Sequence, residues 1–170
     1  MAFPRKLTGT LDEFCKAIAQ RESSNNPTII NSAGFMGLYQ FGEAALIDLK
    51  YLKSNNFNRA NFDNKLDKSQ WTGKDGVFDT YGFLRRPDIQ TKAFQEMIII
   101  RIRRINRLGL YNFVNKTIDG VYITLSGLVA GAHLVGEGGL RDWLVEGRPI
   151  KDGNGVHVKE YVSKFGGYKL

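Results

Sequence analysis

One long helix is predicted between residues 87 and 109, and it constrains the fold more than any other part of the sequence. Pro87 suits the first turn of a helix, and Gly109 suits the position just beyond its last turn. Between them the apolar residues form a stripe that widens in the middle to nearly the whole circumference: Phe94, Ile98, Ile99, Ile100, Ile102 and Ile105. A helix that is apolar nearly all round is buried by its neighbours. The sequence therefore favours a fold built around this helix.

The rest of the sequence also predicts mostly helical structure. Thr10 and Glu13 have the spacing of a capping box, so a first helix is predicted from Leu11 to near Ser23. Further helices are expected at residues 42–52, 111–118, 124–135, 140–145 and 157–165, and the turn-forming residues 31–34 predict a short β-hairpin. We therefore expect a mainly α fold with at most a small β-hairpin, in a single domain over residues 1–170.

Glu22 stands at a position where a core residue is expected. The first helix carries an apolar stripe whose next position is Glu22: Leu11, Phe14, Cys15 and Ile18. The helix ends just beyond Glu22, so the carboxylate meets partial burial and the negative end of the helix dipole, and both disfavour its ionisation. A carboxyl group that holds its proton to higher pH is what a general acid requires. The alternative is a Glu at a frayed helix end that faces water or pairs with Arg21 or with an Arg distant in the sequence.

Two segments of the chain resemble motifs of one enzyme family. The first begins at Glu22, and the second covers residues 132–140. Glu22-Ser23, followed after a short loop by SAGFMGLYQ at residues 32–40, resembles the "ES … S-x-G-A-x-G-L-M-Q" signature of lytic transglycosylases and related phage muramidases, in the lysozyme-like superfamily. Residues 132–140 resemble that family's "A-Y-N-x-G-x-G-x-V" motif, with His133 at the aromatic position and Leu134 in place of the asparagine.

A third match lies at the start of the long helix. Gln90 and Ala93, which follow Pro87, resemble the family's "P-x-x-Q-x-x-A" helix opening. Together the three matches span residues 22–140.

The resemblance implies a lysozyme-like catalytic domain that cleaves the β-1,4 bond between MurNAc and GlcNAc in peptidoglycan. In such an enzyme Glu22 is the general acid. By motif position, Ser32, Tyr39 and Gln40 would orient the substrate or its 2-acetamido group, and His133 is a further candidate for substrate binding. The resemblance leaves open whether the enzyme is a hydrolytic lysozyme or a lytic transglycosylase.

Two more residues were candidates for the site, each with a structural alternative. Glu43 is the candidate second carboxylate of a hydrolase, or else an acid placed at a helix start, where the dipole stabilises it. Trp71 would offer an apolar face to a sugar ring, or else pack beneath the long irregular segment 53–76 together with Phe57, Phe62 and Leu66. Gly34 and Gly37 would let a glycan strand approach the backbone, or else form an ordinary turn.

The composition of the chain indicates which classes of partner to expect. The formal net charge of +7 favours an anionic partner, which could be peptidoglycan with its stem-peptide carboxylates or an anionic membrane surface. We expect no nucleic acid as a partner, because the basic residues are not interleaved with aromatics in a recognisable module. With only Cys15, His133 and His157 as possible soft ligands, no metal site is predicted, and no cofactor is expected. We expect a monomer.

The start of the chain lacks the apolar core of a signal peptide, and no run approaches the length of a membrane span. We therefore expect synthesis in the cytoplasm and action on the cell wall, in phage lysis or as an exported effector. The alternative function is a wall-binding or phage tail structural module with a vestigial site, favoured by the loss of the motif asparagine at Leu134.

Overall fold

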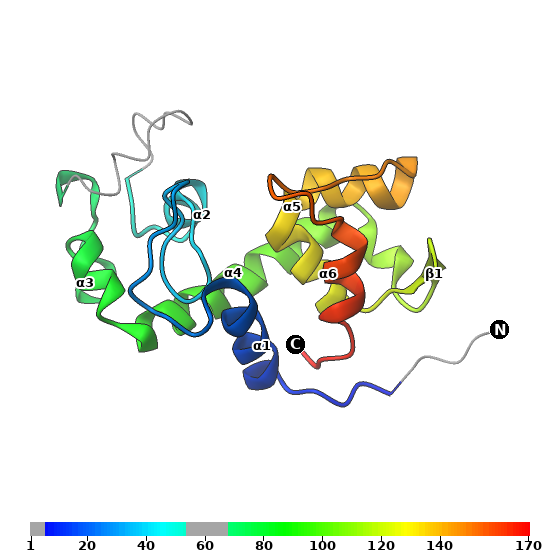
Figure 1. Cartoon of the computed structure of the whole chain (residues 1–170), viewed down its shortest axis with the longest axis horizontal. Helices are drawn as coiled ribbons and strands as arrows, with labels where there is room; N and C mark the ends of the chain where they lie inside the picture. The colour runs from blue at the N-terminus through cyan, green and yellow to red at the C-terminus, as the bar shows by residue number, and fades with distance from the viewer. Residues whose placement is uncertain (1–5, 54–67) are drawn as a thin grey trace. The chain divides into compact units, whose positions relative to one another are not determined.

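The computed structural model describes residues 6–53 and 68–170 (Figure 1). The prediction of a mainly α fold with a small β-hairpin is confirmed. Its α-helices, with their bounds, are α1 (Leu11–Ser23), α2 (Glu43–Asp48), α3 (Thr80–Leu84), α4 (Pro87–Arg107), α5 (Leu125–Glu146) and α6 (Val158–Lys164). Short 3₁₀ helices are η2 (Lys68–Gln70), η3 (Lys74–Gly76) and η4 (Leu110–Phe113), and the strands are β1 (Thr117–Ile118) and β2 (Val121–Tyr122).

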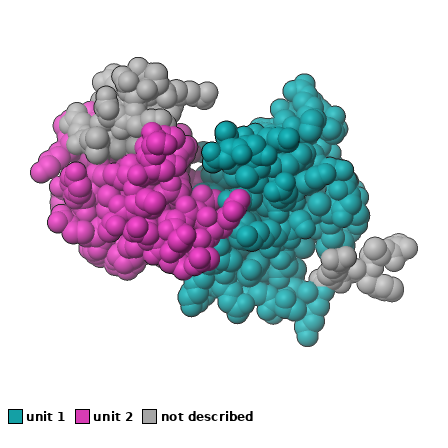
Figure 2. Space-filling model, viewed as in Figure 1, with its two compact units in different colours: residues 1–17, 98–170 teal, residues 18–97 magenta. Residues whose placement is uncertain are grey.

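The chain forms two compact units, which Figure 2 shows in different colours. Unit 1 consists of residues 1–17 and 98–170, and unit 2 of residues 18–97. The most deeply buried large side chains of unit 1 include Phe14, Ile105, Leu110 and Phe165. Those of unit 2 include Ile18, Met36, Leu46, Tyr51, Phe83 and Phe94. Both boundaries between the units fall inside helices, one in α1 and one in α4.

Helix α1 has the limits that the sequence predicts. The Thr10 hydroxyl accepts a hydrogen bond from the Glu13 amide at 3.2 Å, so the predicted cap is present at its start. The helix ends at Ser23, because Ser24 and Asn25 adopt left-handed backbone angles with φ of 52° and 61°.

Helix α4 also has its predicted limits, with Gly109 just beyond its end at φ 72°. Its middle is less enclosed than the sequence suggests, since Ile99 is half exposed. Helix α2 is shorter than the predicted 42–52, because Lys50 turns to a φ of 66° soon after Asp48.

The two helices expected at 124–135 and 140–145 lie on either side of a break at Gly136 within α5. Gly136 has φ 75° and ψ 165°, which is not a helical conformation, so α5 consists of two helical segments joined by a kink at this glycine. At its start, the Thr124 hydroxyl accepts from the amides of Gly127 at 3.2 Å and Gly167 at 3.1 Å, so the same side chain caps α5 and holds the C-terminal segment.

The prediction of a helix over 111–118 is wrong. A single 3₁₀ turn, η4, is followed by the antiparallel pair β1–β2, in which Thr117 faces Tyr122 and Ile118 faces Val121. Asp119 and Gly120 form the two-residue turn with φ of 50° and 77°, as a type I′ hairpin requires. Near residues 31–34, where a hairpin was expected, Ile30 pairs with Met36 through an isolated bridge. Within residues 6–53 and 68–170, no helix is long and apolar enough to cross a membrane.

Candidate active site

Glu22 lies in the last turn of α1, within unit 2, and is half-buried. Its neighbour Ser23 is buried, and the Ser23 hydroxyl lies 2.9 Å from the Leu38 carbonyl oxygen and 3.1 Å from the Ala19 carbonyl oxygen, to which it donates. This bond joins the end of the helix to the middle of the loop that carries the second motif. The end of α1 and the loop 32–40 are therefore neighbours in the fold.

The loop itself has a defined backbone. Met36 exchanges hydrogen bonds with Phe41 at 3.1 and 2.8 Å, and the Gly37 amide donates to the Ile29 carbonyl at 2.8 Å. Gln40 closes the turn between these bonds with φ 50°, and its side-chain amide donates to the Gly37 carbonyl at 3.1 Å. Gln40 is half-buried, whereas Ser32 is exposed in the preceding turn.

Gln90, a buried residue of α4, anchors this loop from inside. Its Oε1 accepts from the Leu38 amide at 2.8 Å, and its Nε2 donates to the carbonyls of Phe83 at 2.9 Å and Pro27 at 3.1 Å. A buried amide with three partners fixes the segments that it joins, because breaking any of these bonds leaves an unpaired polar group. The sequence marks Gln90 only as a motif match, and its role as an anchor is visible only in the structure.

Glycine at position 37 is required by the same contact. Gly37 has φ 77°, and a Cβ added there would lie 2.5 Å from Oε1 of Gln90. The family-like spacing of this glycine therefore has a local explanation in the packing of the loop on α4.

Tyr39 supports the loop from the core of unit 2. Its ring stacks on Phe94 with centroids 4.2 Å apart and an interplanar angle of 5°, and its hydroxyl lies 3.0 Å from the Thr91 hydroxyl. Because the ring is buried, Tyr39 presents no face to a substrate, and its role is to position the loop.

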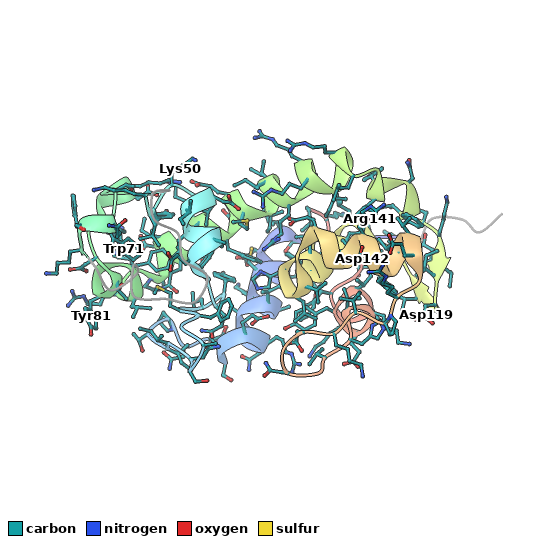
Figure 3. All side chains as sticks on the ribbon, turned by 90° about the horizontal axis from the view of Figure 1, so that it is seen from above. Lys50, Trp71, Tyr81, Asp119, Arg141 and Asp142 are labelled. Carbon is teal, nitrogen blue, oxygen red and sulfur yellow. The ribbon has the colours of Figure 1, made fainter. Side chains whose placement is uncertain are left out.

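Trp71 is also a core residue and is only 5% exposed. The centroid of its ring lies 5.8 Å from the ring centroid of Phe83. Its backbone pairs with Leu52. This burial favours the packing alternative over sugar binding for Trp71, which is labelled in Figure 3. The other anchors expected in this segment, Phe57, Phe62 and Leu66, lie outside the described residues.

Glu43 is the first residue of α2 and is 3% exposed. Its position agrees with the alternative of an acid at a helix start, where the dipole favours a negative charge. A carboxylate with so little accessible surface is poorly placed to activate a water molecule.

His133 belongs to unit 1, in α5, three residues before the kink at Gly136. It is half-buried. Just after the kink, Glu137 pairs with Arg101 of α4 at 2.9 Å, with side chains 13% and 12% exposed. This nearly buried ion pair joins the second half of α5 to α4 within unit 1.

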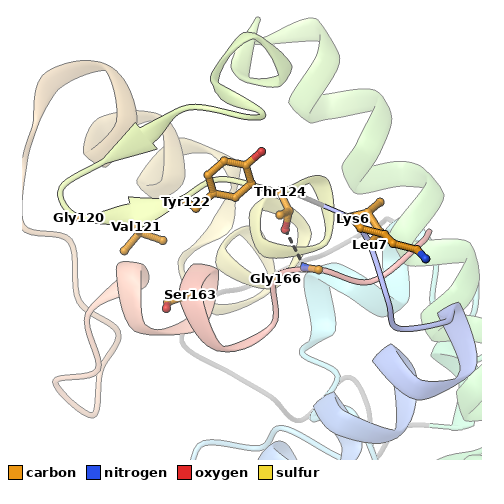
Figure 4. A pocket seen from close by; sticks show the side chains of 9 residues that line it. Lys6, Leu7, Gly120, Val121, Tyr122, Thr124, Ser163 and Gly166 are labelled. Atoms are coloured by element: carbon orange, nitrogen blue, oxygen red, sulfur yellow. Dashed lines mark hydrogen bonds between the residues drawn. The ribbon is translucent and has the colours of Figure 1, made fainter. Parts of the chain in front are cut away.

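Unit 1 also contains a pocket of about 240 Å³ (Figure 4). Its lining includes the side chains of Lys6, Tyr122, Thr124 and Ser163 and the backbone of Gly166 and Gly167. The Thr124 hydroxyl that faces it is already engaged as the cap of α5. In the part of the chain that the structure describes, no three His, Cys, Asp or Glu residues are grouped so that they could hold a metal ion.

The chain was compared with protein-family models, with curated proteins and with solved structures, and it matches none of them.

Proposed function

We propose that this protein is a muramidase, which cleaves the MurNAc-GlcNAc β-1,4 bond of peptidoglycan with Glu22 as the general acid. The observation that carries the proposal is the placement of a half-buried Glu22 in the last turn of α1, directly before Ser23, whose hydroxyl binds the Leu38 carbonyl of the motif loop at 2.9 Å. A glycosidase needs an acid held beside the groups that bind the sugar, and this bond, which joins the residue after Glu22 to the loop, supports such an arrangement.

In the first step, the Glu22 carboxyl group gives its proton to the GlcNAc oxygen that leaves, and the bond to C1 of the muramoyl residue breaks. The positive charge that develops at C1 is then quenched by a nucleophile. Ser32 and Gln40 are the polar side chains of the loop with accessible surface, so they are proposed to hydrogen-bond the substrate. The loop is held in place by Tyr39 and by the Gln90 amide. Trp71 packs against Phe83 in the core of unit 2.

The burial of Glu43 favours the transglycosylase route over the hydrolytic one. With Glu43 buried, the Glu22 carboxylate left by the first step accepts the proton of the muramoyl 6-hydroxyl, and the oxygen of that hydroxyl bonds to C1. The product is a 1,6-anhydro end, and Glu22 regains its proton. A hydrolase would instead add water at C1 and leave a reducing end.

The first prediction concerns Glu22→Gln, measured by the clearing of purified sacculi and by mass spectrometry of the released muropeptides. The rate should fall by roughly 10²-fold or more, the usual contribution of general acid catalysis. Glu13→Gln is the matched control, since Glu13 is an exposed Glu of the same helix, and it should keep the parental rate. A Glu22→Gln variant that clears sacculi at the parental rate would contradict the proposal.

The products decide between the two routes. Anhydro-muramoyl ends support the transglycosylase, and reducing ends support the hydrolase. If the parental protein binds sacculi but releases no muropeptides, it is a wall-binding module and not an enzyme.

A further inference from the structure

Phe35, in the middle of the motif loop, is an aromatic residue with an accessible ring. We propose that this ring is the platform on which one pyranose ring of a glycan strand stacks. The inference rests on the proposed function, because it names how the site takes its substrate. Phe35 is 37% exposed, in contrast to Tyr39 and Trp71, whose rings lie in the core. It replaces Trp71 as the aromatic residue of unit 2 to which sugar binding is assigned.

The backbone of Phe35 is held by Asn31. The Asn31 side-chain oxygen accepts from the amides of Phe35 and Ala33, at 3.0 Å each, and the Asn31 amide donates to the Phe35 carbonyl at 2.9 Å. These three bonds close the tip of the hairpin between Ile30 and Met36. The position of Phe35 is therefore determined before any ligand binds.

The ring of Phe35 packs against Gly42. A Cβ at position 42 would lie 2.8 Å from Cε1 of the ring, so the ring rests directly on the backbone of Gly42. Gly42 is the residue before Glu43, at the start of α2. An aromatic ring fixed in this way loses little conformational freedom when a ligand stacks on it, which favours binding.

The chemistry around the ring suits a neutral sugar. Residues 27–42 carry no charged side chain. Ile29 and Ile30 are partly exposed beside the polar side chains of Asn31 and Ser32, which are exposed as well. A pyranose has C–H bonds on its faces, which pack on an aromatic ring, and hydroxyl or amide groups at its edge, which can reach Asn31 and Ser32.

The test measures binding without turnover, in the Glu22→Gln background, to a soluble GlcNAc hexamer by calorimetry. Adding Phe35→Ala should weaken binding roughly three- to tenfold, which is the range expected for loss of an aromatic stack. Phe35→Trp should restore it. The matched control is Tyr81→Ala, because Tyr81 is an aromatic residue of the same unit that is 64% exposed (Figure 3) and should bind the hexamer as the parent does.

A second variant keeps the ring and moves it. Gly42→Ala places a Cβ against Phe35 and should weaken hexamer binding to a similar extent, while thermal melts verify that both variants are folded. Equal affinities for the Phe35→Ala and Tyr81→Ala variants would overturn the inference. So would a result in which Phe35→Ala abolishes binding to phosphatidylglycerol vesicles and leaves hexamer binding unchanged, because the exposed tip would then be a membrane contact.

Failure of this inference is distinguishable from failure of the proposed function. If sacculi are cleaved in a Glu22-dependent way and Phe35→Ala has no effect on binding, only the inference fails. If the parental protein cleaves nothing but binds the hexamer through Phe35, the proposed enzyme activity fails and the sugar platform stands.

Discussion

At the scale of single residues, the contact between Gly37 and Gln90 decides the shape of the candidate site. Gly37→Ala should destabilise the protein for two reasons, a left-handed φ that costs about 1–2 kcal/mol and a Cβ that displaces the Gln90 amide. Displacement leaves buried polar partners unsatisfied, at about 1–3 kcal/mol for each. The free energy of unfolding, measured in urea, should therefore fall by about 3 kcal/mol or more.

Gly76→Ala is the matched control for this variant. Gly76 lies in the same unit with nearly the same φ, 76°, but nothing lies within 4 Å of the Cβ position. The Gly76→Ala variant should lose only the part of the free energy of unfolding that the left-handed backbone angle costs. In a Gln90→Ala background the excess cost of Gly37→Ala over Gly76→Ala should disappear, as a double-mutant cycle would show. If that excess persists without Gln90, the contact does not explain the glycine.

The sequence identifies Glu22 and the limits of α1 because a helix has a period, and an acid on an apolar stripe stands out against it. Tyr39, Trp71 and Phe35 lie in loops, where no period separates a buried aromatic ring from an exposed one. The burial of Tyr39 and Trp71 follows from tertiary contacts with Phe94 and Phe83, whereas Phe35 rests on Gly42 and stays partly exposed. For this reason sugar binding, which the sequence leaves open for Trp71, is proposed for Phe35 instead.

At the scale of secondary-structure elements, the cap of α6 makes the stability of unit 1 sensitive to pH. His157 is the N-cap residue, and its Nδ1 accepts from the Lys159 amide at 3.0 Å, so the neutral ring carries its proton on Nε2. Burial, followed by the charge of Lys159, lowers the pKa of His157, with Lys151 acting in the same direction and Asp119 and Glu160 against it. Protonation would remove the acceptor that caps the helix.

Because the pKa of His157 is lower in the folded state, the unfolded state binds more protons below about pH 6.5, and stability falls as the pH decreases from there toward the folded pKa. His157→Asn keeps a capping oxygen that does not titrate. Thermal melts at pH 7.5 and pH 5 should therefore show a larger loss for the parental protein than for His157→Asn. The carboxylates with lowered pKa, such as Asp88 at about 2, respond only at more acidic pH. An equal loss in both proteins would exclude His157 as the cause.

The elements themselves are largely predictable, and the exceptions have physical reasons. The hairpin at 117–122 is indicated by Asp119-Gly120, a pair that favours a type I′ turn, but strands of two residues show no alternation to support it. The two segments predicted at 124–135 and 140–145 agree with the non-helical backbone of Gly136, which separates the two halves of α5.

At the scale of the whole molecule, the division into two units is not visible in the sequence. A domain boundary is usually indicated by a linker or a change in composition. Here both boundaries fall inside α1 and α4, where the apolar periodicity continues without interruption. Length and composition therefore predict one domain, and only the pattern of contacts separates residues 18–97 from the remainder.

The net charge of +7 leads to a prediction for the intact protein. If the basic surface contributes to wall binding, the affinity of the Glu22→Gln variant for sacculi should fall as salt is raised, because exposed charges are screened beyond ~8 Å at physiological ionic strength. Arg103→Ala, which removes an exposed cation of α4, should reduce this salt dependence.

Phe35→Ala should lower the affinity without changing the salt dependence, because stacking involves no ion. Cosedimentation with sacculi over a range of salt concentrations measures both effects. If binding does not respond to salt, the net charge does not contribute to wall binding, and the sugar contacts would account for the affinity by themselves.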